Sequence, residues 1–201
     1  MTSSREQFNK ATSFIKREGL NEFMEWLEKE TDFFTAPAST IYHSNFEGGL
    51  LEHSLNVLRF ALNNFNMIAK EKPEYEYLKE SVILCSLFHD VAKCNFYFKT
   101  EKWTKDENNK WKSYQGYEVN DSLPLPHGPK SVFLISKFIK MTDAEALAIS
   151  WHMGQTDLVQ PSTMSKYAYD KAFDHPLVKI IHTADLLSLT LENIIDYKNL
   201  K

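Results

Sequence analysis

The chain has 201 residues, 43% of them hydrophobic and 25% charged, a composition that excludes disordered, collagen-like and small disulfide-stapled proteins. The formal net charge of -4 argues against a protein that coats long duplex nucleic acid, because such binding needs many Lys and Arg contacts to phosphates. A small nucleotide remains compatible with this charge.

Two features predict the compartment. No run of residues approaches the roughly 20 apolar positions of a membrane helix. Cys85 and Cys94 lie beside an apolar run, which predicts reduced thiols rather than a disulfide. We therefore expect a cytoplasmic protein without a membrane partner.

Apolar residues recur at three- and four-residue spacing, which predicts an all-α fold of about seven to nine helices. Residues 1–34 are expected to form helices that pack on the rest. Capping boxes begin the first helix at Ser3 and Ser4, and Gly19 is expected to end it. A loop with His43 and Asn45 then leads into a helix over about 50–69.

The next predicted helix, about 75–92, is apolar on nearly every face and ends with His89 and Asp90. In residues 95–123 the pattern changes to aromatic residues separated by polar ones, which predicts an insert that is a small hairpin or a lid. Helices follow over about 129–140, from a capping box at Thr142 to about 154, and from Pro176 onward. No linker stands out, so 1–201 reads as a single domain.

Six polar residues lie at helix ends or inside apolar helices, where an unpaired polar group is costly: His53, His89, Asp90, His127, His152 and Asp185. Imidazole and carboxylate groups are ligands of zinc, manganese, iron and cobalt, and a carboxylate can bridge two ions. Each histidine alone is more often a hydrogen-bonded core residue. For His175 and His182 we expect structural roles, His182 by orienting Asp185.

The motifs around these residues resemble the HD-domain metal-dependent phosphohydrolases. That family has one histidine, a His-Asp pair and a distant aspartate, matched here by His53, His89–Asp90 and Asp185. The segments GGLLEHS at 48–54 and HDVAK at 89–93 are similar to the family's first-histidine helix and to its His-Asp-x-x-Lys motif. The local resemblance is to the HD module of a 3′-to-5′ exoribonuclease branch and to stand-alone HD hydrolases of bacteria and phages.

The resemblance implies an HD-domain helical bundle with a divalent transition metal. His53, His89, Asp90 and Asp185 would hold one ion, and Asp90 would bridge to a second ion on His127 and His152. The candidate metals are Mn, Fe, Co, Ni and Zn, with manganese the first to test. With one ion alone, His127 and His152 would instead bind substrate or donate a proton.

The implied reaction is hydrolysis of a phosphoester of a nucleotide or of a short or cyclic oligonucleotide, with Asp90 and Lys93 as catalytic residues. Lys93 would meet a phosphate oxygen; its alternative is a solvated lysine that complements the helix dipole. Further substrate contacts are expected from His43, Asn45, Tyr97 and Trp103, the aromatic rings by stacking on a base, although aromatics at such spacing more often pack in a core.

Two other functions remain open on sequence grounds. One is a nucleotide-sensing module that keeps the HD fold without the chemistry. The other is a mixed-valent di-iron oxygenase, which uses a nearly identical ligand set on the same scaffold. Under any of these functions the protein could be a homodimer, which one chain's sequence does not decide.

Overall fold

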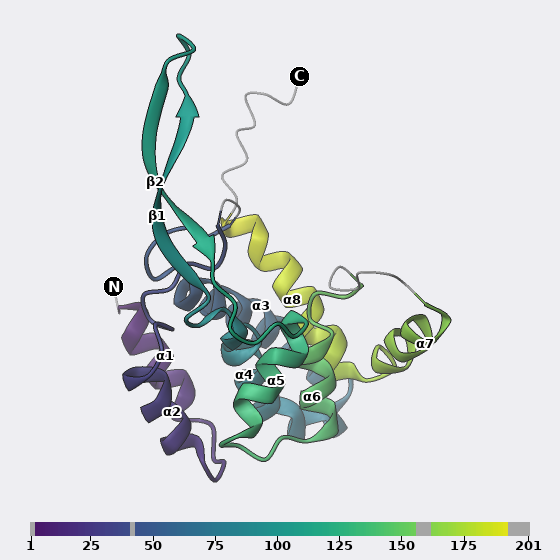
Figure 1. The fold of residues 1–201 in the computed structure, drawn as a ribbon. Coiled ribbons are helices and arrows are strands. Elements are labelled where there is room, and N and C mark those ends of the chain that lie inside the picture. Colours follow the sequence, from purple (N-terminus) through teal and green to yellow (C-terminus); the bar gives the residue numbers. More distant parts are fainter. Residues whose placement is uncertain (1–2, 41–42, 156–161, 193–201) are drawn as a thin grey trace.

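The computed structural model describes residues 3–40, 43–155 and 162–192. This part contains eight α-helices and a two-stranded antiparallel ribbon (Figure 1). The helices are α1 (Ser4–Thr12), α2 (Leu20–Lys29), α3 (Gly49–Glu71), α4 (Lys79–Phe88), α5 (His127–Ser136), α6 (Asp143–Ser150), α7 (Thr163–Ala172) and α8 (Pro176–Glu192). Two short 3₁₀ turns, Pro73–Leu78 and Val91–Lys93, flank α4.

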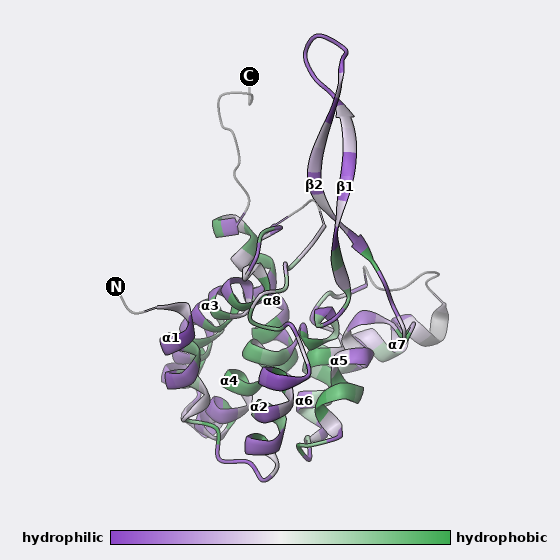
Figure 2. Ribbon diagram, turned by 60° about the vertical axis from the view of Figure 1, so that its left-hand side comes forward, coloured by the Kyte–Doolittle hydropathy of each residue, from purple (hydrophilic) through white to green (hydrophobic). Residues whose placement is uncertain are grey.

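The core forms around α4, as its apolar run predicts. Every residue from Ser81 to Phe88 is buried, because α3, α6 and α8 pack around this helix while α5 packs on α6. Figure 2 shows hydrophobic positions on the helix faces that meet inside this bundle. The aromatic rings of Phe23 and Phe88 meet edge to face at 4.9 Å, which fastens the N-terminal helices to the core.

The fold is mostly helical, as predicted, but it is not all-α: within the predicted insert, residues 97–119 form strands β1 (Tyr97–Lys105) and β2 (Trp111–Val119). Their register pairs Tyr97 with Val119 and Lys105 with Trp111. Asp106 Oδ1 accepts hydrogen bonds of 2.9 Å from the Asn108 and Lys110 amides and so closes the turn. The hairpin alternative was therefore the right one, and the ribbon projects away from the helices (Figure 1).

Several predicted helix boundaries are also wrong. The first helix ends at Thr12, and Gly19 is instead the N-cap residue of α2. At Gly19 φ is +80°, and a Cβ atom would lie 1.9 Å from the Phe138 carbonyl oxygen, so this position needs glycine. The predicted helix over 75–92 is shorter, Lys79–Phe88, and Asp90 with φ -106° and ψ 18° lies outside the helical conformation.

A buried carboxylate ties the N-terminal segment to α6. Glu145 is fully buried, and it accepts hydrogen bonds from Arg17 Nη2 and Ser81 Oγ, both at 2.6 Å, and from the Thr142 amide at 2.8 Å. The last of these completes the predicted capping box.

Replacing this carboxylate is expected to destabilise the fold. Glu145→Ala leaves Arg17 and Ser81 without their buried partner, which should lower the free energy of unfolding by about 2–3 kcal/mol. Urea unfolding would measure this as a lower midpoint with an unchanged slope. The matched control is Glu25→Ala, which removes an exposed carboxylate paired with Lys29; equal midpoints for both variants would contradict the prediction.

None of the described helices combines the length and the apolar character needed to cross a lipid bilayer.

Candidate metal centre

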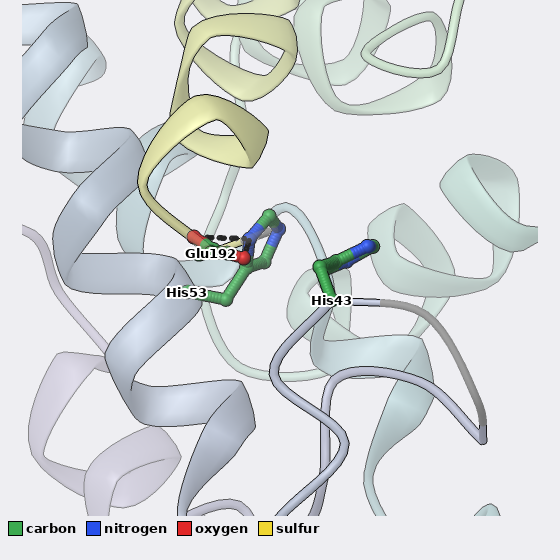
Figure 3. Close-up of side chains that lie close together, drawn as sticks. All are labelled: His43, His53 and Glu192. Atoms are coloured by element: carbon green, nitrogen blue, oxygen red, sulfur yellow. Dashed lines mark hydrogen bonds and ion pairs between the residues drawn. The ribbon is translucent and has the colours of Figure 1, made fainter. Parts of the chain in front are cut away.

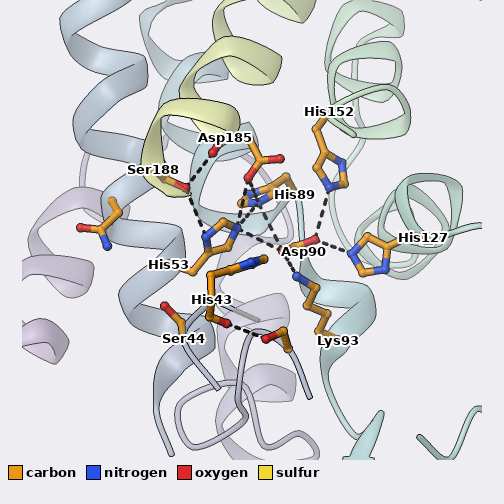
Figure 4. A network of polar contacts seen from close by, with 12 residues as sticks. His43, Ser44, His53, His89, Asp90, Lys93, His127, His152, Asp185 and Ser188 are labelled. Atoms are coloured by element: carbon orange, nitrogen blue, oxygen red, sulfur yellow. Dashed lines mark hydrogen bonds and ion pairs between the residues drawn. The ribbon is translucent and has the colours of Figure 1, made fainter. Parts of the chain in front are cut away.

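Five segments far apart in the chain bring the six predicted ligands to one place (Figure 4). His53 lies on α3, His89 caps the end of α4, and Asp90 follows it. His127 is the first residue of α5, His152 follows α6, and Asp185 lies on α8. All but the half-buried His127 are buried, so their polar atoms have little access to water.

Asp90 lies between two groups of donors. Its Oδ2 atom is 3.3 Å from His53 Nε2 and 3.5 Å from His89 Nε2. Its Oδ1 atom is 3.3 Å from His152 Nε2 and accepts a hydrogen bond from His127 Nε2. Asp185 Oδ1 completes the first group at 3.3 Å from His53 Nε2. The arrangement therefore has two lobes that share one carboxylate.

Backbone carbonyls fix which nitrogen of two histidines faces the centre. His89 Nδ1 donates to the Ser86 carbonyl at 2.9 Å, and His152 Nδ1 donates to the Ile149 carbonyl at 2.7 Å. A carbonyl only accepts, so each Nδ1 carries the hydrogen and the neutral ring has its lone pair on Nε2. Both rings thus present a metal-ligating nitrogen to the centre.

The donor atoms fit a bound cation. His53 Nε2 and His89 Nε2 are only 3.1 Å apart, a distance at which two lone pairs repel unless a proton or metal ion lies with them. His152 Nε2 is buried and makes no hydrogen bond to a described residue, which is costly unless something else engages it. The groups His53–His89–Asp90 and Asp90–His127–His152 each place their donor atoms within 4.8 Å of one another.

Burial and nearby charges keep His89 and Asp90 in the protonation states that bind a metal ion. Burial lowers the pKa of His89 to about 3, which keeps its ring neutral. Burial alone would raise the pKa of the Asp90 carboxyl, but the charge of Lys93 and the hydrogen bond from His127 hold it well below its usual range. Asp90 is therefore an anion over the whole neutral range.

His53 differs from His89. Burial alone would lower the pKa of His53, but hydrogen bonds to Asp185, Asp90 and Glu192 raise it well above its ordinary value of 6.5. A metal ion at Nε2 must therefore displace a proton at neutral pH.

This proton makes metal binding pH-dependent. Below the raised pKa of His53, we expect the dissociation constant for Mn²⁺ to increase by up to about tenfold for each unit of pH decrease. Calorimetric titration in two buffers of different ionisation enthalpy, at pH 7, should show release of protons on binding. Heats that do not depend on the buffer would contradict the prediction.

Sequence reasoning missed Glu192, which holds His53 from behind (Figure 3). Its Oε2 atom lies 3.0 Å from His53 Nδ1 and accepts from Ser44 Oγ at 3.1 Å, while Oε1 accepts from Asn56 Nδ2 at 3.1 Å. Glu192 lies seven residues after Asp185, two turns along the same helix face. That spacing was the available signal, and it is why both carboxylates reach the same imidazole.

A cavity of about 940 Å³ opens above the centre, and three of the predicted substrate residues line it: His43, Lys93 and Tyr97. Lys93 is 8% exposed, with Nζ 2.6 Å from Asp90 Oδ2, so the solvated-lysine alternative is wrong. His43 Nε2 is buried without a hydrogen bond to a described residue.

The structure does not bring the other two predicted substrate residues to the cavity. Asn45 is exposed and lies outside its lining. Trp103 is 59% exposed on the projecting part of the ribbon, because β1 leads away from the helices after Tyr97. Of the described ribbon residues, only Tyr97 lines the cavity, so the ribbon is not a lid here.

The two remaining histidines, His175 just before α8 and His182 on α8, have structural partners. His175 Nδ1 accepts the Leu177 amide at 3.2 Å at the start of α8. The sequence predicted that His182 orients Asp185. Instead, His182 donates from Nδ1 to the His152 carbonyl at 2.6 Å. It thereby fixes the turn that carries a candidate ligand.

Comparison with curated proteins finds similarity to the dihydroneopterin 2′,3′-cyclic phosphate phosphodiesterase of Methanocaldococcus jannaschii. The two chains are 35% identical over 71 residues, which is 35% of this chain and 28% of that protein. The match thus covers little more than a quarter of the curated relative. No family model and no solved structure matches the chain.

Proposed function

We propose that the protein is a metal-dependent phosphohydrolase that cleaves a phosphoester of a nucleotide or of a short or cyclic oligonucleotide. The observation that carries the proposal is the two-lobed donor cluster that shares Asp90 at the base of the cavity. The curated relative is named as a phosphodiesterase, which supports this class of reaction. The mixed nitrogen and oxygen donors suit Mn, Fe, Co, Ni or Zn.

His53, His89, Asp90 and Asp185 would hold one ion, and His127, His152 and the other oxygen of Asp90 a second. Bound divalent ions supply the positive charge that neutralises a phosphate and activates a water molecule. Asp90 is central because it alone faces both groups of histidines. Its anionic state offsets part of the positive charge that two ions would place in a buried site.

Lys93 would contribute a further charge at the phosphate. Burial alone would lower its pKa, but Asp90 raises it above the ordinary value, so the side chain is an ammonium at neutral pH. The group lines the cavity and can donate to a phosphoryl oxygen as negative charge develops there. Burial raises the pKa of Tyr97 beside it, so this phenol stays protonated and can donate a second hydrogen bond.

A metal assay followed by a substrate screen tests the proposal. Protein purified without chelators should contain close to two transition ions, and with added Mn²⁺ it should hydrolyse one class among nucleoside phosphates, 2′,3′-cyclic phosphates, cyclic dinucleotides and short RNA. His175→Ala, a histidine outside the cluster, should retain metal and turnover.

Two results would contradict the proposal and identify the alternative. The absence of bound metal and turnover after addition of manganese, cobalt, nickel and iron would favour a sensing module. Consumption of oxygen by an iron-loaded sample, without phosphate ester cleavage, would favour the oxygenase.

A further inference from the structure

One wall of the cavity takes no part in holding metal and has a different chemical character. His182, Leu186 and Leu189 lie at i, i+4 and i+7 on α8, so they share one helix face and all line the cavity. Tyr169 of α7 and Met153 extend this wall. Leu186 and Met153 remain 52% and 38% exposed, so the wall presents apolar surface toward the cavity that a ligand could cover.

Aromatic rings pack against the wall from behind. The ring of Phe173 lies 4.3 Å from that of Tyr169 and meets the ring of His182 nearly edge-on at 5.0 Å. At Gly154 a Cβ atom would come within 2.9 Å of His182 Cε1, so glycine lets the turn after α6 pack against this imidazole. These contacts hold the two rings in place before a ligand binds, which lowers the entropic cost of binding.

His182 gives the wall one directional polar group. Because its Nδ1 donates to the His152 carbonyl, Nδ1 carries the hydrogen and Nε2 of the neutral ring is an acceptor. Among the residues that the structure describes, the hydrogen bond of this ring is the one from Nδ1. An apolar wall with one fixed acceptor matches a planar ring whose faces are apolar and whose edge carries an N–H donor.

We propose that this wall, formed by His182, Leu186, Leu189 and Tyr169, is a subsite for a planar nitrogen heterocycle of the substrate, with His182 Nε2 accepting from a ring N–H. The assignment rests on the proposed function. Asp185, a proposed metal ligand, lies on the same helix face, so a substrate whose ring contacts this wall would have its phosphoester beside the metal ligands. Guanine-type purines and pterins both carry such a ring N–H, and the experiment separates them.

Binding of the heterocycle without a phosphoester tests the subsite directly. Guanosine and neopterin, which carry a ring N–H, and adenosine, whose ring nitrogens only accept, would be titrated into the purified protein by calorimetry. Guanosine or neopterin as the tightest ligand identifies the source of the ring, and adenosine as the tightest would overturn the acceptor role of His182 Nε2. Leu186→Ala should weaken that ligand about five- to tenfold through lost apolar contact. The matched control is Leu187→Ala, which changes a neighbouring leucine of similar exposure, 41%, outside the cavity lining.

His182→Asn tests the acceptor while sparing the fold. The asparagine amide can still donate to the His152 carbonyl from the position of Nδ1, but it has no atom at the position of Nε2. We expect about fivefold weaker binding of the heterocycle, with unchanged metal content. In His182→Gln, where the amide reaches toward the Nε2 position, binding should be partly restored.

The outcomes separate this inference from the proposed function. Equal binding by the Leu186 and Leu187 variants, or phosphoester turnover without any heterocycle binding, would overturn the subsite and leave the hydrolase. Heterocycle binding that follows the variants as expected, in a protein that hydrolyses no ester, would support the subsite and contradict the hydrolase.

Discussion

Asp90→Asn is expected to lower kcat/KM by about a thousandfold or more and to remove most of the bound metal. The substitution keeps the shape of the side chain but removes the negative charge that faces both groups of histidines. An amide has one oxygen and cannot bridge two cations with two anionic oxygens. Loss of this one group therefore weakens both lobes at once, unlike loss of any single histidine.

Metal content by elemental analysis and turnover with added Mn²⁺ would measure this effect. Circular dichroism would show whether the helices survive, which matters because Lys93 loses its buried partner. Asp121→Asn is a suitable control: it removes the carboxylate paired with buried Lys130 outside the metal cluster. If Asp90→Asn keeps near wild-type turnover, the site assignment is wrong.

Lys93→Met is expected to lower kcat by about a hundredfold while metal stoichiometry stays unchanged. Methionine has nearly the length and apolar stem of lysine but lacks the ammonium that stabilises charge at the phosphoryl oxygens. Lys93→Met is expected to keep its bound metal, whereas Asp90→Asn is expected to lose most of it, so metal content distinguishes the two variants. Because the pKa of Lys93 is raised above its ordinary 10.5, the residue stays charged between pH 6 and 9, and the activity ratio of variant to wild type should be constant there.

Steady-state kinetics at several pH values would check both statements. Lys130→Met, which removes another buried lysine that pairs with an aspartate, should leave kcat within about twofold of wild type once folding is confirmed. An unchanged kcat and KM in Lys93→Met would exclude the phosphate role and leave Lys93 as a counter-charge for Asp90.

The sequence determined the helical class and the identity of the six clustered residues. Helical periodicity reports which face of a segment is buried, and polar residues on such faces are costly enough to stand out. The capping box at Thr142 was predictable for a similar reason, because it depends on residues three apart. Helices and capping boxes, which depend on residues a few positions apart, were therefore predictable from the sequence.

Tertiary structure alone decided the rest. The support of His53 by Glu192 joins residues 139 positions apart; the spacing from Asp185 places Glu192 on the same helix face but does not identify the residue that it meets. Trp103 was expected to line the cavity because it is aromatic. It lies outside the cavity because the ribbon projects away from the helices. His182 likewise donates to the His152 carbonyl, not to Asp185 three residues away, because α6 packs against α8 and the turn after α6 brings that carbonyl to the side of α8.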